Sequence, residues 1–154
     1  MKILLVYYSW SGNTRKLAQK ITSKVKCDVE EIYETGKRDK RWVFLTGGFE
    51  ALFGGKSRIE KPKRNPSDYD FVLLGGPVWA GRISPAMRSY LFQCGKVGDY
   101  AVFMTEKGDD PSKALKDLKE MVGKEPAASL IVREKDIAGA DIQGFLGKIM
   151  VKSP

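Results

Sequence analysis

A polar turn near the N-terminus carries the side chains best suited to binding chemistry. Three hydroxyls and one carboxamide stand within six consecutive residues, Ser9, Trp10, Ser11, Gly12, Asn13 and Thr14. The turn follows an apolar run and opens a segment with helical spacing, where backbone N–H groups and the helix dipole favour a phosphate. Gly12 would let the backbone close around such an anion. A plain capped strand-to-helix turn would also account for the pattern, which matches neither the P-loop nor the dinucleotide fingerprint.

Few other side chains in the sequence suggest catalysis. The chain has no histidine, so the commonest general base and metal ligand is missing. Cys27 and Cys94 lie far apart and form no C-x-x-C pair, which argues against a disulfide scaffold and against a zinc site. We therefore expect no metal centre and assign no catalytic residue, and a bound cofactor is the simplest source of chemistry.

Five short apolar runs predict the strands that position the turn. They span residues 3–8, 28–33, 71–75, 100–105 and 128–133. The first, third and fourth are almost continuously apolar, which is typical of parallel strands covered on both faces. The second run is more polar, because Asp28, Glu30 and Glu31 interrupt it. We therefore predict that the second strand lies at an edge of the sheet.

Helical patterns alternate with these runs. One begins near Asn13, a second is marked by the pair Ser84 and Pro85, and a third by Asp110 and Pro111, each pair offering an N-cap and a first-turn proline. Further helical spacing occurs at residues 142–150, and Gly123 is placed to end the third helix. The alternation predicts right-handed crossovers in one α/β domain spanning residues 1–154, with a doubly wound parallel sheet.

The segment between residues 36 and 64 is strongly basic. It has nine Lys or Arg against three Asp or Glu, so it holds +6 of the net charge of +8. Such a surface would attract an acidic protein or a phosphorylated ligand, although a merely solvated face would look the same. We expect no nucleic-acid partner, because no binding motif is present. Apolar residues at positions 42–53 predict a bent helix that could also serve a homodimer.

The composition is that of an ordinary globular protein. Hydrophobic residues make up 42% and charged residues 30% of the chain, and no apolar run approaches the ~20 residues of a membrane span. The apolar start at residues 1–8 is only as long as a strand and has no small-residue cleavage site. We therefore expect a cytoplasmic protein without a membrane span.

Three loops together resemble the flavodoxin-like family. The turn from Ser9 to Thr14 is similar to the family's first loop, Ser/Thr-x-Ser/Thr-G-N-T, which wraps the phosphate of FMN. The segment after the third strand contains Gly75, Gly76, Pro77, Val78, Trp79, Ala80 and Gly81, and it resembles the G-x-P-V-W-x-G loop of NAD(P)H-oxidising and related members. After the fourth strand, Thr105, Glu106, Lys107 and Gly108 stand where the third flavin loop is expected.

The resemblance implies a flavodoxin-like fold, with a five-stranded sheet of order 2-1-3-4-5, and it implies FMN as the cofactor. The backbone of Pro77 to Gly81 and of Thr105 to Gly108 would bind the polar edge of the flavin ring. Trp79 would stack on the ring or shield it, unless it packs on the core. The peptide at Gly81 is a candidate for rearrangement next to flavin N5 when the ring is reduced.

Two functions are compatible with this resemblance. The first is an electron-transfer protein, a redox carrier that exchanges electrons with a protein partner. The alternative is an NAD(P)H-dependent quinone or flavin oxidoreductase, which the G-x-P-V-W-x-G loop and the basic segment favour. A third hypothesis is a flavin-binding scaffold without catalytic activity. The basic charge departs from the electron-carrier flavodoxins, which are typically acidic around the flavin and often have an aromatic residue in the third loop.

Overall fold

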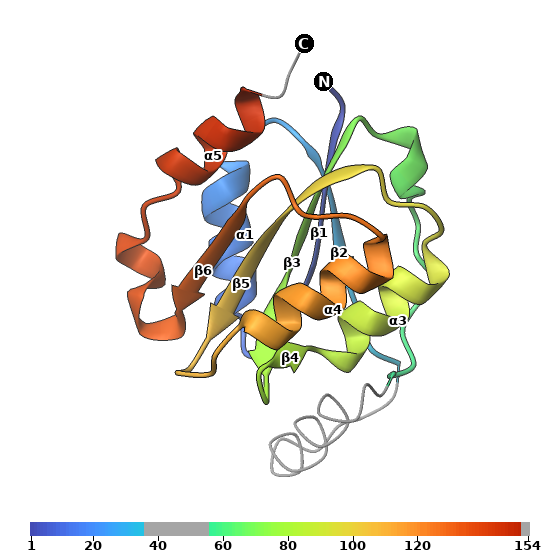
Figure 1. Ribbon diagram of the computed structural model, residues 1–154, viewed down its shortest axis with the longest axis horizontal. Helices are drawn as coiled ribbons and strands as arrows, with labels where there is room; N and C mark the ends of the chain where they lie inside the picture. The colour runs from blue at the N-terminus through green and yellow to red at the C-terminus, as the bar shows by residue number, and fades with distance from the viewer. Residues whose placement is uncertain (36–55, 152–154) are drawn as a thin grey trace.

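The computed structural model describes residues 1–35 and 56–151, which form one sheet with helices on both faces (Figure 1). Five parallel strands lie in the order β2-β1-β3-β5-β6. They are β1 (Ile3–Tyr8), β2 (Asp28–Ile32), β3 (Phe71–Trp79), β5 (Asp99–Glu106) and β6 (Ser129–Arg133). Counted along the chain without β4, this is the predicted order 2-1-3-4-5. The prediction of a doubly wound α/β sheet is confirmed.

The sheet has one short strand that the sequence did not predict. Strand β4 (Arg82–Ile83) pairs antiparallel with the end of β3, with Val78 opposite Ile83 and Trp79 opposite Arg82. Strand β3 is also four residues longer than expected, because it continues past Gly75 to Trp79. Four residues predicted to lie in a loop are therefore in the strand, namely Gly76, Pro77, Val78 and Trp79. The following turn is a tight hairpin.

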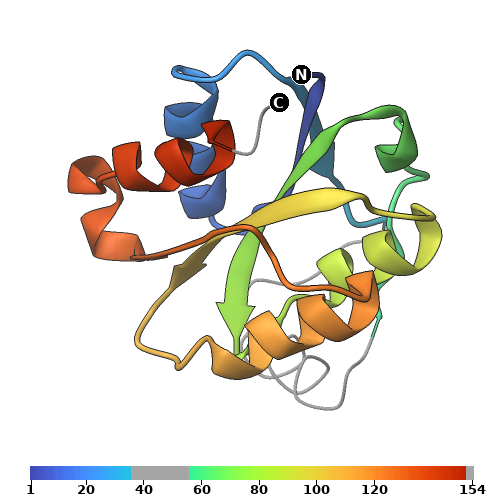
Figure 2. The same cartoon turned by 45° about the horizontal axis from the view of Figure 1, so that its top comes forward.

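In the part of the chain that the structure describes, two helices cover each face of the sheet. Helices α1 (Asn13–Thr22) and α5 (Gln143–Met150) lie on one face, and α3 (Pro85–Gln93) and α4 (Ser112–Val122) on the other (Figures 1 and 2). Two 3-10 helices, η2 (Pro66–Asp68) and η3 (Glu134–Gly139), lie in connecting segments. Within the described residues, no helix is both long and apolar enough to cross a membrane.

The predicted helix ends are confirmed at three of four positions. Ser84 caps α3, since its Oγ accepts a hydrogen bond from the backbone N–H of Met87 at 3.2 Å. Gly123 ends α4 in the left-handed conformation, with φ 88°, and α1 begins at Asn13. Asp110 is not the cap of α4, which begins at Ser112 after Pro111. Its carboxylate instead accepts the N–H of Ser112 at 2.9 Å and so still supports the first turn.

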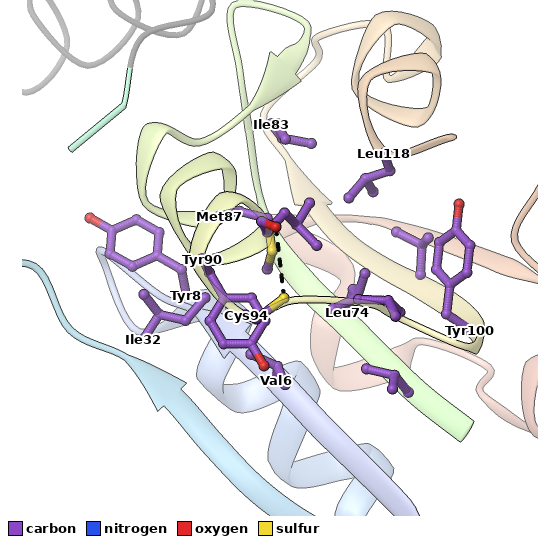
Figure 3. Packing of buried hydrophobic residues seen from close by; sticks show 14 of the residues in the cluster. Val6, Tyr8, Ile32, Leu74, Ile83, Met87, Tyr90, Cys94, Tyr100 and Leu118 are labelled. Carbon is purple, nitrogen blue, oxygen red and sulfur yellow. Dashed lines mark hydrogen bonds between the residues drawn. The ribbon is translucent and has the colours of Figure 1, made fainter. Parts of the chain in front are cut away.

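The core consists of two apolar clusters, one on each face of the sheet. Along β1, Leu4 and Val6 face one cluster while Ile3 and Leu5 face the other, because side chains alternate across a strand. Figure 3 shows the cluster on the side of α3 and α4, where Leu118 of α4 is part of the packing around the strands. Burial on both faces explains why β1 reads as a continuous apolar run.

The second strand lies at the edge of the sheet, as its polar sequence predicted. Its Glu30 is only 8% exposed, and its carboxylate accepts hydrogen bonds from the backbone N–H groups of Lys63 at 2.7 Å and Arg64 at 3.1 Å. The end of the basic segment thus runs along this edge. The predicted helix at residues 42–53, and with it the proposed homodimer contact, lies outside the described residues.

Candidate functional site

The candidate site lies where the carboxyl ends of three parallel strands meet. Strands β1 and β3 are neighbours, and their crossover helices lie on opposite faces of the sheet. In open α/β sheets, ligands bind in the crevice at such a switch point, as flavodoxin itself illustrates. The loops after β1, β3 and β5 all open at this edge, which is the lower one in Figure 1. The topology therefore brings together three segments that are far apart in sequence.

A cavity of about 350 Å³ lies among these loops. Eight residues expected at the site line it, namely Trp10, Ser11, Thr14, Pro77, Val78, Trp79, Ala80 and Lys107. The volume falls within the roughly 300–1,000 Å³ of small-molecule pockets. Other hollows of about 530 to 640 Å³ are larger but more open. One of them reaches Glu106 at the end of β5, but none is lined by residues of the turn after β1 or of the hairpin after β3. Among the described residues, no group of His, Cys, Asp and Glu is placed to hold a metal ion.

Two cavity residues were missed by the sequence analysis. Asp109 follows directly on the expected loop, and Glu134 lies just after β6. The position of Glu134 could have been found from the fold, because the carboxyl end of β6 lies at the same edge of the sheet as the other loops. The remaining expected residues do not line the cavity: Ser9, Gly12, Asn13, Gly81, Thr105, Glu106 and Gly108.

Residues of the first loop that do not line the cavity fix its shape. Gly12 adopts a left-handed conformation with φ 95° immediately before α1, a backbone region that glycine enters without steric cost. Ser9 Oγ accepts a hydrogen bond from the N–H of Arg15 at 3.2 Å, and Asn13 Nδ2 donates to Ser11 Oγ at 3.2 Å. The positive end of α1, with N–H groups that lack partners within the helix, thus points toward the turn.

A pair of buried hydroxyls joins the first loop to the third. The Oγ1 atoms of Thr14 and Thr105 lie 2.8 Å apart, and the two residues are 2% and 0% exposed. Thr14 also lines the cavity. Thr105 therefore contributes to the site through Thr14, rather than through a surface of its own.

Two ion pairs hold the third loop, one made by Glu106 and one by Lys107. The carboxylate of Glu106 accepts a hydrogen bond from the N–H of Gly108 and lies 3.3 Å from Arg133 Nε. Lys107 lines the cavity, and its Nζ lies 3.7 Å from the carboxylate of Glu134. Glu106 is thus held by Gly108 of its own loop and by Arg133 at the end of β6. The charged residues that line the cavity are Lys107, Asp109 and Glu134.

Trp79 both lines the cavity and contacts the core. Its ring meets the ring of Tyr8 edge-on, with centroids 5.9 Å apart and planes at 83°, a favourable arrangement for two aromatic rings. The next two residues, Ala80 and Gly81, have φ 50° and 76°. Two consecutive positive φ angles are typical of the tight type I′ hairpin turn. The hairpin therefore presents Trp79 at the mouth of the site.

Arg15, in the first turn of α1, is already paired with an acid. Its guanidinium contacts both carboxylate oxygens of Glu31 on β2. Burial opposes ionisation of Glu31, but hydrogen bonds from Arg15, Tyr7 and Tyr33 outweigh it and lower the pKa of this carboxyl. Burial and the bond to Glu31 raise the pKa of Tyr7 to about 12. The charge of Arg15 is thus offset within the protein.

Comparisons with solved structures identify the fold. No family model matches the chain. A flavoprotein from Lactobacillus acidophilus NCFM, solved in complex with FMN, is 26% identical, with a TM-score of 0.71 over 90% of this chain and 97% of that one. A protein from Bacteroides eggerthii is 22% identical, with a TM-score of 0.78 over 98% and 99%. Flavodoxin from Megasphaera elsdenii is 14% identical, with a TM-score of 0.55 over 84% and 85%.

These similarities define the class of the protein. The chain has the flavodoxin-like fold, and the resemblance inferred from its three loops is confirmed. The neighbours named above include a flavoprotein solved in complex with FMN and a flavodoxin. FMN, the cofactor implied by the sequence, is bound in the Lactobacillus acidophilus relative.

Proposed function

We propose that the protein binds FMN in the cavity at the ends of β1, β3 and β5 and acts as a cytoplasmic electron-transfer protein. One observation carries the proposal: three loops that each resemble a flavin loop line a single cavity of about 350 Å³. The flavin supplies the redox chemistry when bound, and the protein supplies binding, orientation and electrostatics. The neighbouring FMN complex supports the same cofactor.

The residues present fit the two chemically different ends of FMN. Ser11 and Thr14 bring hydroxyls to the part of the cavity next to the N-terminus of α1, which suits a phosphate dianion. Pro77, Val78 and Trp79 form an apolar wall on another side, which suits an aromatic ring. In this arrangement, Arg15 stays with Glu31, so N–H and O–H groups would hold the phosphate.

FMN rather than FAD is the expected cofactor, because the described loops offer one phosphate turn. Calorimetric titration of the apoprotein with FMN, FAD and riboflavin tests this choice. We expect FMN to bind most tightly and riboflavin to lose the contribution of the phosphate turn. Equal affinity for FMN and riboflavin would show that the turn from Ser9 to Thr14 does not bind the phosphate.

A carrier and a reductase differ in how they take up electrons. We infer a carrier because the residues that line the cavity offer groups that bind and orient a flavin, while the flavin would supply the redox chemistry. Stepwise reduction followed in the visible spectrum should show a one-electron-reduced form accumulating. Its absence, together with rapid NADPH oxidation in the presence of a quinone, would instead establish the reductase.

The reductase is the second candidate because the residues that match the G-x-P-V-W-x-G loop form the hairpin at the cavity. A nicotinamide or quinone substrate would then be the partner in place of a redox protein. Tight FMN binding with neither behaviour would point to a flavin-binding scaffold. Two assays on one preparation of the purified protein therefore separate the three outcomes.

A further inference from the structure

The hairpin after β3 holds a residue in an unfavourable backbone conformation. Ala80 has φ 50°, and among the described residues it is the one non-glycine residue with a positive φ. A Cβ in this region clashes with the neighbouring backbone, and such strain persists only where the surrounding structure enforces it. Ala80 and its neighbour Trp79 line the proposed FMN cavity. Some contact outside the cavity must therefore keep the hairpin in place.

An ion pair on the outgoing strand provides that contact. Arg82 Nη2 lies 2.7 Å from Asp117 Oδ1, and Arg82 Nε lies 3.1 Å from Oδ2. Arg82 is paired in register with Trp79, and Asp117 lies on α4. Two parallel N–H···O bonds between a guanidinium and a carboxylate are the strongest and most directional form of this interaction. The two-residue strand β4 is thus tied to α4 directly opposite Trp79.

Asp117 is buried and has a second guanidinium partner besides Arg82. The residue is 3% exposed, and its carboxylate also accepts a hydrogen bond from Arg88 Nη2 on α3 at 3.1 Å. Burial disfavours its charged form, but the two guanidinium groups outweigh that effect and lower its pKa. Breaking such a pair leaves a buried charge without compensation. The buried carboxylate is thus held by two guanidinium groups, one on the hairpin and one on α3.

The hairpin tip is confined on its other side by the loop after β5. A Cβ built on Gly81, whose φ is 76°, would lie 3.2 Å from the carbonyl oxygen of Asp110. The tip therefore has little room toward that loop. The anchor at Arg82 and this close approach together restrict the hairpin to the position in which Trp79 faces the cavity.

We propose that Asp117 is a positioning residue for the flavin site: through Arg82 it holds the strained hairpin so that Trp79 and Ala80, which line the cavity, face the ring. The proposal rests on FMN binding in the cavity. Asp117 does not line the cavity, so it acts through the hairpin and not on the cofactor. Without the anchor, Ala80 relaxes, the binding-competent fraction falls, and the dissociation constant rises in inverse proportion.

A double-mutant cycle with Ala80→Gly tests the mechanism. Glycine adopts a positive φ without steric cost, so the hairpin should then depend much less on its anchor. We expect Asp117→Asn to weaken FMN binding by about tenfold in the natural sequence and by less than about threefold in the Ala80→Gly background. Unequal losses for the oxidised and reduced flavin would shift the potential, by about 59 mV for each tenfold inequality in a one-electron step.

Three further variants separate positioning from stability. Arg88→Gln removes a partner of the same carboxylate that does not lie on the hairpin, whereas Arg82→Gln removes the link itself. Arg82→Gln should reproduce the effects of Asp117→Asn on affinity and potential, and Arg88→Gln should lower mainly the unfolding midpoint. Glu30→Gln removes another buried carboxylate, on the distant edge strand β2, and should leave both flavin measurements unchanged.

The apoprotein provides a readout that does not depend on FMN. The rings of Tyr8 and Trp79 are in contact, so a nuclear Overhauser effect between them reports the hairpin position. It should weaken in Asp117→Asn and return when Ala80→Gly is added. If the parent protein binds no FMN, the proposed function fails, while this signal still tests the anchor. Equal losses of affinity in both backgrounds, or an unchanged ring contact in Asp117→Asn, would overturn the role of Asp117.

Discussion

The buried hydroxyl pair of Thr14 and Thr105 allows a quantitative test of the proposed phosphate site. Each hydroxyl carries one proton, so at 2.8 Å one of the two donates to the other. Thr14 also lines the cavity, and it can donate to a phosphate while accepting from Thr105. We therefore expect Thr14→Val to weaken FMN binding directly, and Thr105→Val to weaken it less, because its effect is transmitted through Thr14.

The size of both effects follows from burial and charge. A hydrogen bond to a charged group contributes roughly 1.5 to 3 kcal/mol, which corresponds to about 10-fold to 150-fold in the dissociation constant for Thr14→Val. In the apoprotein, either single variant leaves a buried hydroxyl without its partner, at a cost of about 1–3 kcal/mol of unfolding free energy. The double variant removes both hydroxyls, so it should cost less than the sum of the single variants.

Calorimetric titration with FMN and urea unfolding of the four apoproteins measure these quantities. Thr22→Val is the matched control, since it removes a hydroxyl at the far end of α1 that bonds only locally to the carbonyl of Gln19. An unchanged affinity in Thr14→Val would mean that Thr14 only ties α1 to β5. Strictly additive losses of stability would show that the two hydroxyls do not act as a pair.

Three further predictions concern the ring, the partner and pH. Trp79→Phe should preserve FMN binding but abolish much of the tryptophan fluorescence that is regained when FMN is removed. If bound FMN does not quench the tryptophan fluorescence of the parent protein, the flavin ring does not lie beside Trp79. The rate of reaction with an acidic redox partner should fall with added salt, because the Debye length shrinks from about 10 Å at 0.1 M to about 3 Å at 1 M. A salt-independent rate would show that residues 37–64 form a solvated surface that does not attract the partner. Tyr7 has its pKa raised from 10.0 to about 12, so its contribution to stability is complete below about pH 10 and is lost as the pH rises toward 12. Urea unfolding at about pH 8 and about pH 11 should therefore show a smaller loss in Tyr7→Phe than in the parent.

The sequence was informative wherever local physics decides the structure. The continuous apolar run of β1 predicted its bounds, Ile3–Tyr8, and the acids of β2 predicted an edge strand. Ser84 and Gly123 are caps whose preference arises within one helical turn. The three loops also converge as the strand order requires. These features need only the spacing of residues along a segment, together with the rule that parallel strands end at one edge.

The end of β3 shows why part of the strand was read as a loop. Gly75, Gly76 and Pro77 weaken a strand in isolation, yet Gly75 and Pro77 fit here for reasons that lie elsewhere in the chain. A Cβ on Gly75 would lie 2.0 Å from the ring of Phe103 on β5. Pairing with β1 ends at Gly75, so Pro77 needs a ladder partner only on the β5 side and its missing N–H costs little. Neither condition can be read from the segment itself.

The contacts that shape the cavity are long-range for the same reason. Thr14 and Thr105 are 91 residues apart, and Arg82 and Asp117 are 35 apart. Glu134 reaches the site because β6 lies next to β5. The sequence shows where each threonine or aspartate stands, but the packing of α1 and α4 on the sheet decides which side chain it contacts.

These long-range contacts bear on how tightly a cofactor could be held. The first loop is joined to the third by the two threonines, Trp79 rests on Tyr8, and the hairpin is anchored by Asp117. Each of these contacts is made between residues of the chain itself, so its ordering entropy is met by folding and not by binding. A site ordered in advance loses little affinity to immobilising its own side chains. Variants that break an anchor should therefore reduce the affinity for FMN even though the substituted side chain never touches it.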